Sequence, residues 1–68
     1  MAITADTTVG EILGGKPNGR AVMEKYIGRP VTESEISMAM GMPLSVVAGY
    51  VAMSREKLNA CIDELNNC

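Results

Sequence analysis

Residues 36–54 read ISMAMGMPLSVVAGYVAMS, and they are the least ordinary feature of the sequence because they hold no charge over nineteen positions, of which thirteen are apolar. Its length approaches the roughly 20 residues of a membrane span, but Gly41 and Pro43 interrupt it and predict two separate helices instead. The β-branched residues of 44–52 would also suit a strand, yet nothing else in the chain alternates with a period of two, and a strand needs a partner. The stretch therefore predicts two packed helices, the second over residues 44–52.

Two capping boxes mark where two of the other helix boundaries lie. In a capping box a Thr side chain accepts a hydrogen bond from the amide three residues on, and a Glu at that position reaches back. Residues 8–11 (TVGE) fit this pattern and predict a short helix over about residues 8–13. Residues 32–35 (TESE) fit it again and predict a helix that Gly41 ends after about two turns.

The second and the last helix have start and stop signals of their own. Pro17 suits the first position of a helix, because its fixed φ is helical and its missing N–H is not needed there, and Gly28 can close that helix in a left-handed conformation. Ser54 can cap the last helix, whose apolar residues share one face: Leu58, Cys61, Ile62 and Leu65. We therefore expect an all-α fold, a compact orthogonal bundle of about five short helices, with residues 1–68 as a single domain and a helix-turn-helix-like pair in the middle.

The composition argues against several classes of function. The chain has 68 residues, six Lys and Arg against eight Asp and Glu, no His and a net charge of −2. Without His it lacks the usual general base at neutral pH and the Ser–His and Cys–His nucleophile pairs, so we expect no enzyme, and neither a cofactor nor a small-molecule substrate is indicated. The net negative charge disfavours nucleic acid as a partner. The first residues have neither the basic segment nor the apolar run of a secretion signal, which predicts a cytoplasmic protein.

Both ends of the chain resemble a known family. Residues 3–13 (ITADTTVGEIL), followed by Pro17 and a helix ending in residues 25–26, are similar to small helical bacterial and archaeal domains described as a redox-disulfide domain associated with hybrid-cluster proteins. Residues 54–66 resemble the acidic, Leu-rich helix that closes those domains. Their signature is a Cys-x-x-Cys pair after the second helix, whereas residues 28–36 (GRPVTESEI) hold no cysteine. The resemblance therefore implies the fold, without the dithiol chemistry, which needs two sulfurs close together.

The two cysteines of the chain lie near its end. Cys61 and Cys68 are seven positions apart, roughly 10 Å along a helix, whereas the Cα atoms of a disulfide lie within about 7 Å. We therefore expect Cys61 to be a small core residue and Cys68 to be an exposed thiol or an intermolecular link. A thiol or redox protein that acts on a partner's thiol through Cys61 or Cys68 is the main alternative function.

The charge-free stretch holds more large apolar side chains than so small a domain can bury. A copper(I) site at Met38, Met40 and Met42 is not expected, because on a helix Met40 points nearly opposite the other two. Met is common at adaptable contact surfaces, so we expect part of the stretch to contact another chain. The sequence predicts a non-catalytic interaction module or small accessory subunit, either a homodimer or docked onto a larger redox or metalloenzyme partner. The partner-binding residues that we predict are Met38, Met42, Val46, Val47 and Tyr50.

The same stretch also fits the apolar spacing of a DNA-binding helix-turn-helix. A DNA reader places Arg, Lys, Asn or Gln at the exposed front of its second helix, where the base edges are contacted. Here those positions hold Leu44, Ser45, Val46 and Ala48. A DNA-binding regulator therefore remains a minor alternative.

Overall fold

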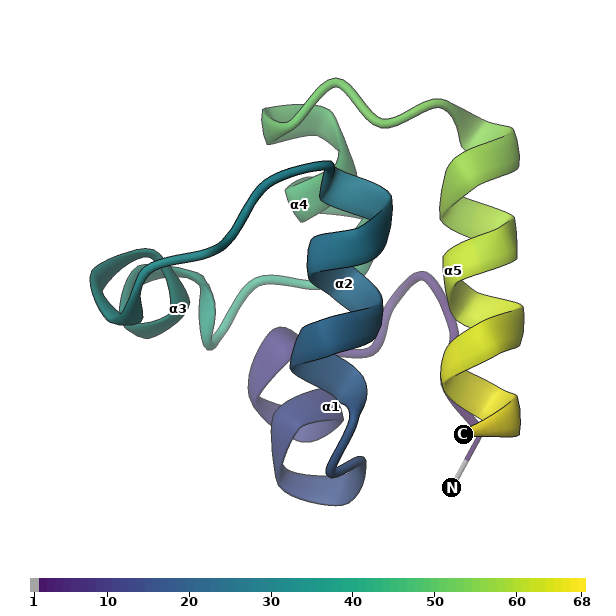
Figure 1. Cartoon of the computed structure of the whole chain (residues 1–68), viewed down its shortest axis with the longest axis horizontal. Helices are drawn as coiled ribbons and strands as arrows, with labels where there is room; N and C mark the ends of the chain where they lie inside the picture. The colour runs from purple at the N-terminus through teal and green to yellow at the C-terminus, as the bar shows by residue number, and fades with distance from the viewer. Residues whose placement is uncertain (1) are drawn as a thin grey trace.

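The chain folds into helices joined by short turns (Figure 1), and the computed structural model describes residues 2–68. The described residues form five helices: α1 (Val9–Gly15), α2 (Gly19–Ile27), α3 (Glu33–Ala39), α4 (Leu44–Tyr50) and α5 (Arg55–Asn67). Figure 1 shows α2 and α5 side by side and antiparallel, whereas α3 lies farthest from α5. No β-strand occurs in this part of the chain, so the expected all-α bundle is confirmed. Within residues 2–68, no helix combines the length and the apolar character that crossing a bilayer requires.

Side-chain caps fix the start of three helices, as the sequence predicts. At α1 the Thr8 hydroxyl oxygen accepts from the Glu11 amide at 3.3 Å, and the Glu11 carboxylate accepts from the Thr8 amide at 3.1 Å. The same reciprocal pair joins Thr32 and Glu35 at the start of α3. Ser54 accepts from the third amide of α5 at 3.2 Å. Each cap satisfies amide groups that have no partner inside the helix, and such caps are worth about 1 kcal/mol.

The start of α2 differs from the prediction that Pro17 is its first residue. The Gly19 amide donates to the Lys16 carbonyl at 3.0 Å, and Asn18 has φ −95° and ψ 6°. These features describe a β-turn in which Pro17 takes the second position, where its fixed φ is equally suitable. The helix begins at Gly19 in consequence. Its end agrees with the prediction, because Gly28 closes it in the left-handed conformation with φ 90°.

The helix predicted over residues 44–52 ends earlier, at Tyr50. Ala52 adopts a left-handed φ of 55°, and the Met53 amide donates to the Ala48 carbonyl at 2.9 Å. This hydrogen bond across six residues is the helix-ending motif that normally uses Gly at the left-handed position. The sequence gives no signal for it, because Ala rarely takes this conformation.

The N-terminal segment holds the turn between α3 and α4 in place. The Val9 amide donates to the Met42 carbonyl at 3.0 Å, and the Gly10 amide donates to the Met40 carbonyl at 2.9 Å. A side chain at Gly10 would place its Cβ 3.0 Å from that carbonyl oxygen, so the close approach requires glycine. In the opposite direction, the Leu44 amide donates to the Thr7 carbonyl at 3.0 Å.

The hydrophobic core lies between α1, α2, α4 and α5. The largest completely enclosed side chains are those of Ile12, Cys61 and Leu65. Because Cys61 and Leu65 belong to the apolar stripe predicted for α5, that stripe does face the core. Helix α3 contributes no buried residue. Its half-buried Ala39 packs against the core from outside, and the neighbouring turns and surface contacts also hold the helix in position. The buried apolar cluster comprises Ile3, Val9, Ile12, Val22, Met23, Leu44, Cys61 and Leu65.

The two ends of the described chain meet at Asn66. Its side-chain oxygen accepts from the Ile3 amide at 2.8 Å, and its side-chain nitrogen donates to the Ile3 carbonyl at 3.0 Å. Figure 1 shows the start of the described chain, in purple, beside the C-terminal end of α5. This pair of hydrogen bonds attaches the first segment, which carries the buried Ile3, to the last turn of α5.

Candidate functional site

The structure separates the five predicted partner-binding residues into two groups. Met38 and Tyr50 are 83% and 81% exposed, and Val46 is 43% exposed. Met42 and Val47 are half-buried, and Val47 packs against the hydrophobic core. A change at Val47 would therefore disturb the interior as well as any interface. Met40, which is absent from the predicted set, is also exposed.

One side of α4 faces the core and the other faces solvent. Leu44 and Ala48 are buried on the inner side. Four residues lie on the outer side at helical spacing, and all four are exposed: Ser45, Val46, Gly49 and Tyr50. We call these four residues the outer face of α4. A Cβ added at Gly49 would meet no atom within 4 Å, and α4 contains no charged residue. The outer face is therefore uncharged, with Val46 and the Tyr50 ring as its large side chains and open space beside Gly49.

The helix-turn-helix-like pair of α3 and α4 has no cation of its own. The first turn of α3 is acidic instead, with Glu33 and Glu35. Arg20 of α2 binds Glu33 at 2.7 Å, and Arg29 binds Glu35 at 2.9 Å. The Arg29 guanidinium, together with the Thr32 amide, lowers the pKa of the Glu35 carboxyl. These nearby cations are thus paired with carboxylates of the chain, an arrangement that does not suit a phosphate backbone.

A cluster of three polar side chains joins α2 to α5. The Glu64 carboxylate accepts from the Lys25 ammonium at 2.9 Å and from the Tyr26 hydroxyl at 2.9 Å. Lys25 and Tyr26 lower the pKa of Glu64, and the hydrogen bond to Glu64 raises the pKa of Tyr26. None of the three lines either of the cavities described below. Their arrangement therefore serves to connect the two longest helices.

The two thiols differ sharply in environment. Cys61 is 1% exposed, and burial, with a smaller effect of Glu64, raises the pKa of its thiol to about 11. Cys68 is exposed, its sulfur lies 3.3 Å from the Leu65 carbonyl oxygen, and both cysteines are free. The structure thus places Cys61 in the core, as expected. Because the thiolate is the reactive form, exchange with a partner's thiol would have to use Cys68.

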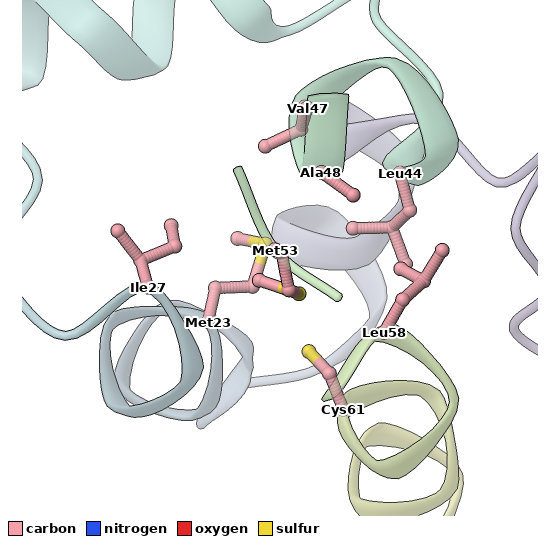
Figure 2. A pocket seen from close by; sticks show the side chains of 8 residues that line it. All are labelled: Met23, Ile27, Leu44, Val47, Ala48, Met53, Leu58 and Cys61. Atoms are coloured by element: carbon pink, nitrogen blue, oxygen red, sulfur yellow. The ribbon is translucent and has the colours of Figure 1, made fainter. Parts of the chain in front are cut away.

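A cavity of about 10 Å³ lies between α2, α4 and α5 (Figure 2), and it has room for about one water-sized group. Three of its lining side chains contain sulfur: those of Met23, Met53 and Cys61. The other lining residues are aliphatic: Ile27, Leu44, Val47, Ala48 and Leu58. Sequence reasoning missed this grouping, because the sulfur-bearing residues come from three separate segments and no motif spacing connects them.

A second cavity of about 40 Å³ lies beneath α3, where it is lined mostly by apolar residues and by Arg20 and Glu35. Pockets that enclose a small organic ligand usually measure about 300 to 1,000 Å³. Neither cavity reaches that volume. Within residues 2–68, no three side chains of His, Cys, Asp or Glu are grouped so that they could hold a metal ion.

In comparisons with known proteins, no family model matches the chain, and no similarity to a curated protein or to a solved structure is found. The resemblance to the domains associated with hybrid-cluster proteins stays a prediction, which rests on residues 3–13, on Pro17 with the helix ending in residues 25–26, and on residues 54–66.

Proposed function

We propose that the protein is a non-catalytic interaction module that associates through the outer face of α4. The observation that carries this proposal is the exposure of Val46 and Tyr50, at 43% and 81%, on a helix without any charge. Side chains of this size contribute about 1.5 to 3 kcal/mol each when they are fully buried. Met38, which is 83% exposed, extends the exposed apolar surface of the charge-free stretch onto α3.

A second copy of the chain is the occupant that this face fits best. Each copy has a net charge of −2, so two copies repel each other over most orientations. Pairing through α4 keeps this repulsion small, because the outer face of α4 has no charge that would lie close to a like charge. Gly49 has open space beside it, which allows another helix backbone to approach closely. Glycine inside a helix costs about 1 kcal/mol relative to Ala, and no contact within the described chain requires it at this position.

A larger protein with an apolar groove would use the same face. The resemblance to domains associated with hybrid-cluster proteins makes a redox enzyme or metalloenzyme the partner class that we propose for this form. The thiol alternative depends on a different part of the molecule, the exposed Cys68. Reductant therefore distinguishes the two hypotheses: it should leave association through α4 unchanged and abolish a disulfide-linked dimer through Cys68.

Sedimentation velocity over a concentration series, with and without reductant, tests the proposal. We expect a dimer that persists in reductant and that Val46→Asp shifts toward monomer. Val46 lies in the first turn of α4, where a carboxylate is favourable, so the fold should be retained. The matched control is Ala60→Asp at an exposed position of α5, which should leave the dimer unchanged.

Three outcomes would contradict this reading. A dimer that disappears in reductant would indicate a disulfide through Cys68 and would favour the thiol alternative. A dimer that both Asp variants weaken equally would place the contact outside α4. A wild-type protein that stays monomeric at every concentration would contradict self-association through this face.

A further inference from the structure

The fold brings together three sulfur atoms that are far apart in the sequence. Met23 belongs to α2, Met53 to the turn after α4, and Cys61 to α5, yet all three line the same small cavity. Figure 2 shows their side chains extending into the space between these segments, with the Cys61 sulfur directed toward the two methionines. No nitrogen or oxygen of a polar side chain lines this cavity. Any ion inside it would meet a thiol, two thioethers and hydrocarbon.

We propose that this cavity binds a single copper(I) ion through the Cys61 sulfur, with the Met23 and Met53 thioethers as the additional ligands. Soft sulfur ligands select copper(I), whereas hard cations such as magnesium and calcium require oxygen. On binding, the Cys61 S–H bond gives its proton to solvent and a sulfur–copper bond forms. The metal remains copper(I), so no oxidant or reductant takes part. This inference is independent of the outer face of α4.

The charge of the complex suits a buried site. A copper(I) ion and one thiolate are neutral together, so the complex leaves no net charge in the apolar interior. A zinc(II) ion held by the same single thiolate would keep one positive charge there, which burial penalises strongly. The donor set therefore distinguishes monovalent from divalent metals by charge as well as by softness.

The contacts of the three residues also suit an ion. Cys61 is 1% exposed, and its thiol makes no hydrogen bond to any of residues 2–68, so a metal would displace no existing partner of the sulfur. The cavity of about 10 Å³ excludes anything much larger than a single ion or water. Met53 is half-buried on the turn that contains the left-handed Ala52. Because this side chain is unbranched and only half-buried, it can change conformation to admit an ion.

The test is an anaerobic titration with copper(I) alone, in competition with a colorimetric copper(I) chelator, using the Cys68→Ser protein to remove the exposed thiol. We expect one ion bound per chain. Cys61→Ala should lose this binding, and Met53→Leu should weaken it by about tenfold or more, equivalent to at least ~1.4 kcal/mol. Met40→Leu changes an exposed methionine that does not line this cavity, and it should bind like the Cys68→Ser parent.

Methyl NMR of labelled methionine provides a second readout that does not depend on a buried substitution. Copper(I) should shift the methyl resonances of Met23 and Met53 and leave that of Met38 in place. The proposal is overturned if the Cys68→Ser protein does not compete with the chelator, or if the Met23 and Met53 methyl resonances stay unmoved. If Cys61→Ala fails to fold, the copper(I) affinity of Met53→Leu becomes the deciding measurement. A copper(I) affinity equal to that of the Cys68→Ser parent would then refute the site.

Discussion

Replacing Asn66 by Ala should remove a large part of the stability of this domain. The substitution deletes both hydrogen bonds to Ile3, at 2.8 and 3.0 Å, which are partly buried. A hydrogen bond of this kind contributes about 0.5 to 1.5 kcal/mol, so the loss of two is worth about 1 to 3 kcal/mol. Domains of this length have about 3 to 10 kcal/mol in total. Ile3 is 2% exposed, so its release would also expose core surface.

Asn67→Ala is the matched control for this experiment. Asn67 makes a single exposed hydrogen bond to the Asp63 carbonyl within the same helix, at 2.8 Å. Both substitutions raise helix propensity by the same amount because both replace Asn with Ala, so the difference between them isolates the contact with Ile3. Urea unfolding, monitored by circular dichroism, measures the free energy of unfolding of both variants. We expect Asn66→Ala to be at least about 1 kcal/mol less stable than Asn67→Ala, which corresponds to roughly 4 to 8 °C in Tm. Equal stability of the two variants would refute the role assigned to Asn66.

Three further predictions concern the thiols and one turn. A thiol reagent should label only Cys68 in the folded protein and both cysteines in denaturant, because Cys61 is buried; fast labelling of two thiols in native buffer would contradict this. Burial raises the Cys61 pKa from 9.0 to about 11, so the unfolded chain releases the thiol proton at a lower pH than the folded chain does. The free energy of unfolding should therefore be unaffected below pH 9 and fall by about 2 to 3 kcal/mol as the pH rises to 11. Urea unfolding midpoints measured over this pH range should fall less in Cys61→Ala than in the wild-type protein. Gly28→Ala should cost about 1 kcal/mol because φ is 90° there, whereas Gly14→Ala, in α1 with open space beside it, should be neutral or stabilising in the same assay.

Local signals in the sequence predict most of the helix boundaries. The pairs Thr8 with Glu11 and Thr32 with Glu35 lie within one turn of helix, so their geometry is set by backbone conformation alone. Pro17 shows the limit of such reasoning, because its fixed φ suits both the first turn of a helix and the second position of a β-turn. The hydrogen bond from Gly19 to the Lys16 carbonyl selects the turn, and nothing in the local sequence distinguishes the two.

The candidate sites depend on long-range packing and were harder to predict. Of the predicted partner-binding residues, the structure leaves Met38, Val46 and Tyr50 exposed. The sequence pattern does not show which side of α4 faces inward, and Val47 packs against the core. No pattern in the sequence predicts the sulfur-lined cavity. Its residues Met23 and Cys61 are brought together only when α2 packs against α5.

Amide NMR spectra recorded while the protein is diluted test the central proposal most directly, because a weak dimer shifts only the resonances at its interface. Association through the outer face of α4 predicts shifts concentrated at residues 45–50, present in reductant, and absent in Val46→Asp. Amides on the exposed side of α5, such as that of Ala60, should not move. Spectra that are identical at all concentrations, or shifts confined to the region of Cys68, would contradict the account.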